Sequence, residues 1–265
     1  MKSEQIKEIT ERATEQLVAA LNAGDIEALT GYLKAIGRFH RYSLHNVMLI
    51  ASQRHNASYV AGFRTWKELG RFVKKGEKGI LILAPIVRRK PENDNDTEDR
   101  SNSIAGFRAA YVFDVSQTDG NEVPHIGTVQ GDPSHYAKRL RGFASSQGIA
   151  IEYSDEIAPA RGVSSGGRVM LLPEQPAAEE FSTLAHELAH ELLHRSDRRY
   201  STSRRVRETE AEAASFVVCH AIGLETGSVA CDYIQLWKGD AQLLTESLAY
   251  IRQAASQMLG ALTDE

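Results

Sequence analysis

The residues of this chain that could do chemistry are concentrated between His186 and Glu212. His186-Glu187-x-x-His190 lies within an apolar pattern that predicts a helix over residues 179–195. Histidines four residues apart share a helix face, so both imidazoles can bind one tetrahedral ion such as zinc. Glu187 is then placed to act as general base toward a water molecule that the ion activates. The pattern predicts a metal-dependent hydrolase that cleaves peptide bonds.

The same pattern recurs one turn later at His190-Glu191-x-x-His194, so the register of the site has two possibilities. The apolar residues of the predicted helix gather on one side, with His186 at its border and His194 pointing away. We expect the first register, because a buried metal cleft is more compatible with the border than with the polar face. Tyr200 or His194 is the candidate for stabilising an oxyanion.

Two histidines and a water molecule leave one position of a tetrahedral site open, and a carboxylate from the next helix usually fills it. Glu208 and Glu212 share a helix face, whereas Glu210 points to another side. The residues therefore leave Glu208 and Glu212 as possible ligands. We favour Glu208 as the ligand and Glu212 as the acceptor of a histidine ring N–H, which would fix the tautomer.

Residues 182–190 and 208–212 together resemble the ImmA/IrrE-like zincin metallopeptidase domain, over about residues 133–260. In related zincins the first glutamate of a Glu-x-x-Ala-Asp motif is the third ligand, which points by resemblance to Glu208. ImmA-type members often read Glu-Ala-Asn there, and an alignment on that motif would make Glu210 the ligand instead. The resemblance implies zinc, or another divalent metal, and a protein or peptide substrate. It also implies an edge strand beside the cleft that pairs with the substrate, for which Val169–Leu172 is the candidate.

The charge of −4 conceals a division along the chain. Residues 31–90 contain 13 Lys and Arg but only two acidic residues, which gives this segment a charge of +11. Aromatic residues are interleaved with these cations. Cations can neutralise phosphates while rings stack on unpaired bases, so the segment predicts binding to single-stranded DNA. The candidate DNA-binding residues are Arg41, Tyr42, Asn46, Arg64, Trp66, Lys67, Arg71, Lys74, Lys75 and Lys78.

The motifs Tyr42-Ser43-Leu44-His45-Asn46, Val60-Ala61-Gly62-Phe63-Arg64-Thr65-Trp66 and Gly70–Ile80 resemble the amino-terminal domain of ArdC-type antirestriction proteins, over about residues 35–118. This resemblance implies single-stranded DNA binding on a mobile genetic element, and such domains are often joined to a zincin-type domain. ArdC itself usually carries a somewhat different carboxy-terminal half. An antirestriction role is therefore one expectation among others.

Hydrophobic periodicity predicts an α+β protein with two domains. Residues 1–125 are expected to form amino-terminal helices and a small antiparallel sheet, including a long hairpin of strands 80–87 and 107–115. An acidic loop over 91–103 forms its tip, and a linker covers 119–132. Residues 126–265 are expected to form a mainly helical zincin-like domain with a small sheet. No apolar run approaches 18 residues and there are two cysteines, so no membrane segment and a cytoplasmic location are expected.

These features favour a single-stranded-DNA-binding zinc metallopeptidase with a possible antirestriction role. One alternative is a non-catalytic factor that shields single-stranded DNA and uses zinc only for its structure. Another is a peptidase that cleaves a repressor in response to DNA.

Overall fold

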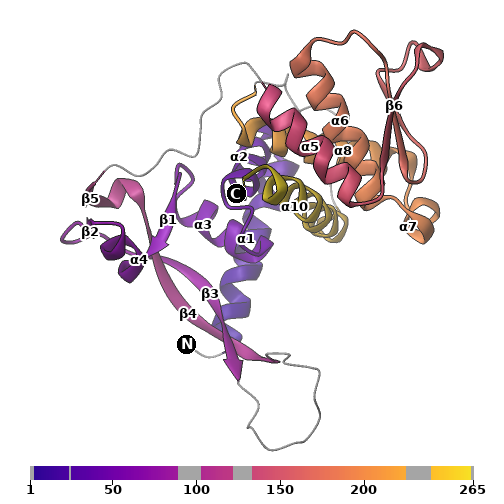
Figure 1. Cartoon of the computed structure of the whole chain (residues 1–265). Helices are drawn as coiled ribbons and strands as arrows, with labels where there is room; N and C mark the ends of the chain where they lie inside the picture. Colours follow the sequence, from indigo (N-terminus) through magenta and orange to yellow (C-terminus); the bar gives the residue numbers. More distant parts are fainter. Residues whose placement is uncertain (1–2, 24, 89–102, 122–132, 225–239, 264–265) are drawn as a thin grey trace, which may run out of the picture. The chain divides into compact units, whose positions relative to one another are not determined.

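The computed structural model describes residues 3–23, 25–88, 103–121, 133–224 and 240–263 (Figure 1). Helices alternate with small sheets, which confirms the α+β class. Contacts divide the chain into two units, the first comprising Met1–Thr14 with Met48–Val123 and the second Glu15–Val47 with Pro124–Glu265. None of the described helices has the length and apolar character needed to cross a membrane.

The predicted domain boundary at residues 125 and 126 lies outside the described residues, as do most of the predicted acidic loop and linker. The boundary stays a prediction. The contacts add one fact that the sequence did not suggest, because Glu15–Val47 pack with the carboxy-terminal part of the chain.

The first unit is built around a three-stranded antiparallel sheet in the order β1-β4-β3. The long hairpin of β3 and β4 is confirmed, and Ile80 pairs with Val112 near its base. A second, two-stranded sheet joins β2 to β5, so the residues around Phe72 form a strand. The elements are α3 (Leu44–Gln53, from Met48), β1 (Val60–Gly62), α4 (Phe63–Glu68), β2 (Arg71–Val73), β3 (Ile80–Arg88), β4 (Ser103–Asp114), η1 (Val115–Gln117) and β5 (Thr118–Gly120). Helix α1 (Ser3–Asn22) contributes its residues up to Thr14.

A buried polar corner fixes the end of β4. The Asp114 carboxylate accepts hydrogen bonds from the backbone N–H groups of Ser58, Tyr59 and Ser116, at 2.8, 3.2 and 3.0 Å. Gln117 accepts from the Asp114 N–H at 2.9 Å. Burial alone would raise the pKa of Asp114, but these hydrogen bonds and one from the Ser116 hydroxyl lower it below its usual value. A charged carboxylate therefore holds this corner at neutral pH.

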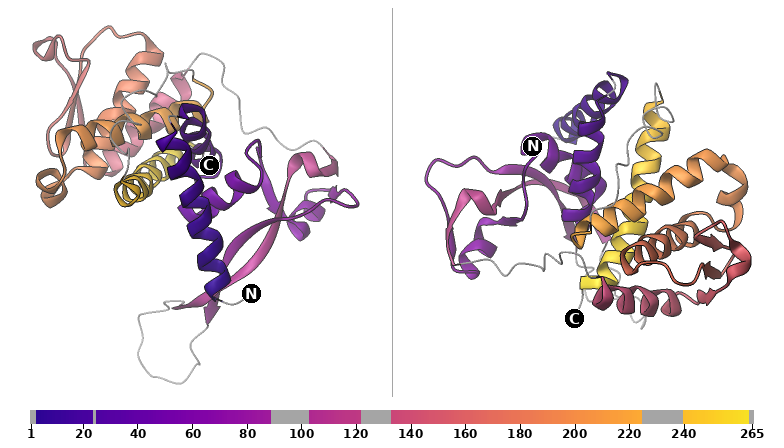
Figure 2. Two further views of the ribbon diagram at one scale, coloured as in Figure 1. Left: turned by 180° about the vertical axis from the view of Figure 1, so that it is seen from behind. Right: turned by 90° about the horizontal axis from the view of Figure 1, so that it is seen from above.

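The second unit is mainly helical, with one three-stranded sheet at its side. Helix α10 packs on α8, α5, α6 and α2, as Figure 2 shows for its contact with α8. The elements are α2 (Ile26–Arg38), α5 (Ser134–Ser146), β6 (Ala150–Tyr153), η2 (Asp155–Ile157), β7 (Gly162–Ser164), β8 (Arg168–Leu171), α6 (Ala177–Leu193), α7 (Ser196–Ser201), α8 (Arg204–Ala221) and α10 (Ala241–Thr263).

Close packing of α6 on α8 positions the chemistry-bearing residues. The buried side of α6 presents large and small apolar residues such as Leu184 and Leu188, whereas α8 presents Ala211, Ala214 and Ser215. The Ser215 hydroxyl donates to the Ser182 carbonyl at 2.9 Å, which ties the two helices together. Small side chains let the helix axes approach, so the polar border of α6 faces the first turns of α8.

The sheet of the second unit has the order β6-β8-β7, with β6 parallel and β7 antiparallel to β8. The expectation that Val169–Leu172 forms the edge strand is therefore wrong, because β8 is paired on both sides. The edge strand beside α6 is β7, which begins at Gly162.

Candidate functional site

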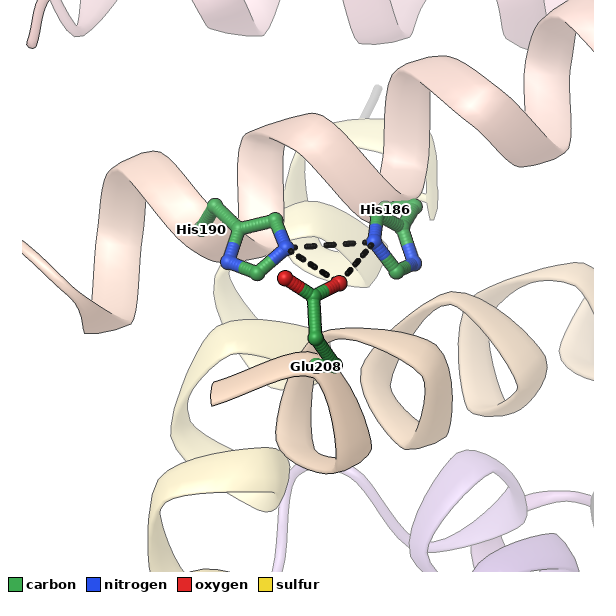
Figure 3. A group of neighbouring side chains, drawn as sticks. All are labelled: His186, His190 and Glu208. Carbon is green, nitrogen blue, oxygen red and sulfur yellow. Dashed lines mark hydrogen bonds and ion pairs between the residues drawn. The ribbon is translucent and has the colours of Figure 1, made fainter. Parts of the chain in front are cut away.

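Three donor atoms from α6 and α8 converge on one point (Figure 3). The Nε2 atoms of His186 and His190 are 3.1 Å apart. Oε2 of Glu208 lies 3.6 Å from the first and 3.5 Å from the second. The structure thus brings together both predicted histidine ligands and the favoured glutamate.

The triangle of donor atoms fits a metal ion. In a tetrahedral site with bonds of about 2.0–2.1 Å, neighbouring ligand atoms are about 3.3–3.4 Å apart. The observed separations of 3.1, 3.5 and 3.6 Å bracket that value. Two imidazoles and one carboxylate form one face of a tetrahedron, and the fourth position would be open to a water molecule or a substrate. Catalytic zinc sites commonly have three protein ligands and one open position, whereas structural sites have four protein ligands.

The electrostatics of the triangle favour a cation. Burial opposes a charge on His186, but hydrogen bonds with Glu208 and Glu212 raise its pKa to about 9. Burial and the neighbouring His186 lower the pKa of His190 to about 4. The hydrogen bond from His186 outweighs burial and lowers the pKa of Glu208 to about 2. The protein thus stabilises one positive charge among these groups.

The three candidate glutamates of α8 occupy different places. Glu208 faces the histidines, and Glu212 lies on the same side with Oε2 3.2 Å from Nδ1 of His186. This contact suits a ring N–H that donates to Glu212 and leaves Nε2 free to bind a metal. Glu210 is fully buried on another side of α8, away from the triangle's donor set.

Glu187 lies beside the triangle in a polar, mostly buried position. Burial raises the pKa of its carboxyl group, and the neighbouring His186 opposes this shift. The hydroxyl and the backbone N–H of Ser164 in β7 donate hydrogen bonds to it. A raised pKa makes a carboxylate a better proton acceptor.

His194 is buried and not on an exposed polar face, which corrects the expectation from the helical pattern. It forms the carboxy-terminal cap of α6, where the contacts of α8 cover it, so helical phase alone could not show its environment. Its Nε2 lies 2.9 Å from Glu210, and its Nδ1 lies 3.0 Å from Nδ1 of His190. Arg198 binds the other oxygen of Glu210 at 2.8 Å. His194 thus acts behind His190, and it does not line the cleft as an oxyanion-stabilising group would.

This chain of contacts can fix the tautomer of His190. If the neutral His194 donates its Nε2–H to Glu210, its Nδ1 has a lone pair that accepts from the Nδ1–H of His190. Nε2 of His190 is then unprotonated and directed at the metal point.

The other oxyanion candidate, Tyr200, lies in α7 with 88% of its surface exposed and does not line the cleft.

The second copy of the motif also has a structural glutamate. Glu191 accepts the N–H groups of Gly166 and Gly167 at 2.8 and 2.6 Å, and it pairs with Arg195. Both glycines have positive φ angles of 66° and 91°, so they form a turn that other residues would strain. Glu191 therefore holds the β7–β8 hairpin on α6.

A cleft of about 470 Å³ opens over the triangle. Gly162 allows β7 to lie directly on α6, since a Cβ atom there would come within 2.6 Å of Thr183 and 2.8 Å of Glu187. The lining residues are Ala160, Gly162, Val163, Ser164, His186, Glu187, His190, Arg199, Arg204, Arg207 and Glu208.

The candidate DNA-binding residues fall in both units. Arg41, Tyr42 and Asn46 belong to the second unit, where Arg41 is exposed, Tyr42 is half-buried and Asn46 is buried. The others belong to the first unit. There, the side chains of Arg64, Lys67, Lys74, Lys75 and Lys78 are exposed.

The burial of Trp66 corrects the expectation that it faces DNA, whereas Arg71 is half-buried and its DNA contact stays a prediction. Trp66 is fully buried, and its indole N–H donates to the Phe113 carbonyl at 2.8 Å. Arg71 donates to Thr118 at 2.8 and 3.0 Å and so joins β2 to β5. An aromatic residue between cations can belong to either the core or a surface, and sequence composition does not separate the two.

Comparisons with known proteins agree with the amino-terminal motifs. Residues 7–113 match the family model described as the N-terminal domain of anti-restriction factor ArdC. The fold is similar to the metal-free and Mn(II)-bound crystal structures of the antirestriction ArdC protein from plasmid R388. Their TM-scores are 0.54 and 0.56 at 22% and 24% identity, and each match covers 96% of this chain and 97% or 98% of the other. The amino-terminal part of the chain is thus similar in sequence to the ArdC amino-terminal domain, and nearly the whole chain shares the ArdC fold.

Two curated relatives extend over nearly the whole chain. An uncharacterized Bacillus anthracis protein is 24% identical over 98% of this chain, which spans about half, 52%, of that protein's length. An uncharacterized Sinorhizobium fredii protein is 26% identical, and the match covers 95% of this chain and 91% of the relative. The ArdC-type amino-terminal domain expected from the motifs is thus confirmed, while the zincin resemblance stays a prediction.

The ArdC-type domain presents a stripe of aromatic rings that the sequence reasoning missed. Alternation along β4 places Phe107, Tyr111 and Phe113 on one face, and Val112 in the core on the other. Phe107 and Tyr111 are 55% and 60% exposed, and Phe63 meets Phe113 edge to face at 6.4 Å. The period-two pattern of β4 could have revealed this stripe.

Proposed function

We propose that this chain is a divalent-metal-dependent peptidase whose ArdC-type domain binds single-stranded DNA, and that it serves antirestriction on a mobile genetic element. The observation that carries the peptidase proposal is the convergence of His186, His190 and Glu208 beside Glu187, in a cleft next to the edge strand β7. The likeness to an ArdC protein crystallised with Mn(II) supports a divalent ion at this point. The histidine-rich donor set and its spacing favour zinc, although a carboxylate ligand also suits manganese.

A bound divalent ion would supply an activated water molecule and polarise the substrate carbonyl. Glu187 takes a proton from the attacking water molecule while the water oxygen forms a bond to the substrate's carbonyl carbon. Glu187 then gives this proton to the amide nitrogen as the C–N bond breaks, which leaves a carboxylic acid and an amine. Ser164 orients the Glu187 carboxylate through its two hydrogen bonds.

Replacing Glu187 with Gln tests this proposal. The amide cannot take a proton, so peptide cleavage is expected to fall by at least about 100-fold while metal content and thermal stability stay close to wild type. The exposed Glu156→Gln is the matched control and should cleave normally. Cleavage by Glu187→Gln at the wild-type rate would rule out the proposed base.

The same variant separates the peptidase from the rival role as a shielding factor. If Glu187→Gln still protects incoming DNA from restriction, proteolysis is dispensable for antirestriction and the metal has a structural task. If protection is lost while DNA binding persists, cleavage is the active step.

The aromatic stripe and the exposed lysines support single-stranded DNA binding. Rings on a sheet face can stack on unpaired bases, and lysines neutralise phosphates. Single-strand and duplex affinities at two salt concentrations test this proposal. We expect preference for the single strand, and each phosphate contact removed, for example by Lys75→Gln, should lower the salt slope by about 0.7. Equal binding of duplex DNA would contradict the stacking mode.

A further inference from the structure

The segment from Arg195 to Arg207 contains six arginines, and two of them have buried carboxylate partners. Arg195 pairs with Glu191 at 3.0 Å. Arg198 pairs with Glu210 at 2.8 Å and stacks over the Tyr250 ring at 3.5 Å. These two arginines hold the end of α6 and its neighbours in place. Their charges are neutralised by the protein itself.

Three further arginines, Arg199, Arg204 and Arg207, line the cleft over the metal triangle. Arg207 is half-buried, and its guanidinium donates to the carbonyls of Arg199, at 2.7 Å, and Thr202. These carbonyls fix its position and do not neutralise its charge. In the part of the chain that the structure describes, neither Arg199 nor Arg207 has a carboxylate within ion-pair distance.

The cleft therefore has more positive than negative charge. Among the described residues that line it, the carboxylates are Glu187 and Glu208, which the proposed function uses as base and metal ligand. Arg204 lies 3.8 Å from Glu208 with 87% of its side chain exposed, so this pair is loose. A bound divalent ion would add further positive charge to the cleft. A ligand that fills this cleft needs negative charge of its own.

The edge strand shows what kind of chain the ligand is. On either side of β7, backbone hydrogen bonds join the chain to β8 and the residue after it. The Ser165 N–H donates to the Arg168 carbonyl at 2.8 Å, and the Leu172 N–H donates to the Arg161 carbonyl at 2.9 Å. Because antiparallel pairs alternate, the backbone groups of Gly162 and Ser164 point to the open side of the strand. The bond from Ser164 to Glu187 shows that this open side faces the catalytic groups. The Ser164 N–H donates to Glu187, so the main-chain groups of Gly162 and the Ser164 carbonyl are the ones that this edge offers to an extended polypeptide.

We propose that the cleft selects acidic peptides, with Arg207 as the main specificity-determining residue and Arg199 and Arg204 in support. A guanidinium binds a carboxylate through two parallel N–H donors, so Arg207 recognises an Asp or Glu side chain near the scissile bond. This inference rests on the proposed peptidase function. Phosphates of a nucleic acid would also suit arginines, but they make no use of the strand edge.

Binding to the catalytically silent Glu187→Gln protein tests the selection without turnover. The probes are two fluorescently labelled, unstructured peptides that differ only in Glu versus Gln, measured with metal bound. The Glu peptide is expected to bind about tenfold more tightly, since hydrogen bonds to charged groups are the stronger kind. Adding Arg207→Gln should abolish the difference. Adding Arg205→Gln should preserve it, because Arg205 is exposed on the same helix but does not line the cleft.

Cleavage of a mixed peptide library by the metal-loaded protein, read by mass spectrometry, separates this inference from the proposed function. Cleavage sites enriched in Asp or Glu, with the enrichment lost in Arg207→Gln, support both. Cleavage that needs Glu187 but shows no acidic preference overturns the selection and leaves the peptidase. Absence of Glu187-dependent cleavage together with Arg207-dependent binding of the Glu peptide overturns the peptidase and retains an acidic ligand. Equal binding of both peptides, or displacement only by single-stranded DNA, overturns the inference.

Discussion

The metal cleft and the aromatic face of the ArdC-type domain use their polar residues in opposite ways. Behind the cleft, Glu212 contacts His186 and His194 contacts His190, and Glu210 in turn contacts His194. On the aromatic face, Phe107 and Tyr111 are exposed, and the candidate lysines of the same domain are exposed as well. The comparison teaches that a site for one ion obtains its binding free energy from a few residues that contact one another. A surface for a polymer obtains its binding free energy from many separate residues. Substitutions in the cleft should therefore have larger effects.

The largest effect is expected from Glu208→Gln. Loss of the charged ligand leaves two imidazoles, so metal affinity should fall by well over 100-fold, beyond the range of about 10–100-fold typical of supporting residues. Metal titration by calorimetry measures it. Glu212→Gln is the matched variant on the same helix face and should stay within the supporting range. A larger loss for Glu212→Gln than for Glu208→Gln would reverse their roles.

Behind the other histidine, His194→Phe should weaken metal binding by about 10–100-fold, because it removes the acceptor that fixes the tautomer of His190. A purely structural role would lower thermal stability without this change. His194→Gln can still accept from His190 and donate to Glu210, so it should restore much of the affinity. Equal metal affinity of His194→Phe and wild type would show that His190 is positioned without this chain of contacts.

On the aromatic face, Tyr111→Ala should weaken single-stranded DNA binding by about 1–3 kcal/mol, the usual contribution of one stacked base. Fluorescence anisotropy with a labelled oligonucleotide measures the loss. Tyr153→Ala serves as control, since Tyr153 is a half-exposed aromatic residue of the other unit. Unchanged binding by Tyr111→Ala would remove the stripe from the interface.

The smallest effect concerns acid stability of the ArdC-type domain. Because the pKa of Asp114 is lowered on folding, its charged form contributes stability that is present above the unfolded pKa of about 3.9 and is lost as pH falls through the folded value. Urea unfolding between pH 6 and acid conditions measures this loss. Asp114→Asn should be less stable than wild type at pH 6, and the difference should shrink in acid. A constant difference would assign the corner's stability to uncharged hydrogen bonds.

Much of the cleft could be predicted from sequence because helical periodicity relates residues four positions apart. That rule places His186 near His190 and puts Glu208 and Glu212 on one face. The environment of His194 could not be predicted in this way, since it depends on which helices cover the end of α6. The edge strand was missed because Gly162–Ser164 is too short for an alternating pattern and contains a glycine.

In the ArdC-type domain the long hairpin followed from two runs rich in apolar and aromatic residues, at 80–87 and 107–115. The exposure of its aromatic residues did not follow in the same way. Trp66 and Phe72 are close in sequence, yet the first is fully buried and the second is 60% exposed. Both positions have an aromatic side chain next to a cationic residue, so the tertiary arrangement decides between core and surface.

Helix α6 also serves as a spacer for the strand beside it. Glu187 holds Ser164, and Glu191, one turn further on, holds the turn at Gly166 and Gly167. Four residues of helix advance about 6 Å, a length that is insensitive to the side chains between them. The position of β7 along the axis of α6 is therefore fixed by these two attachments. An inserted residue between Ser164 and Gly166 would break one of the two attachments, whereas changes at exposed positions of the strand would leave its alignment intact.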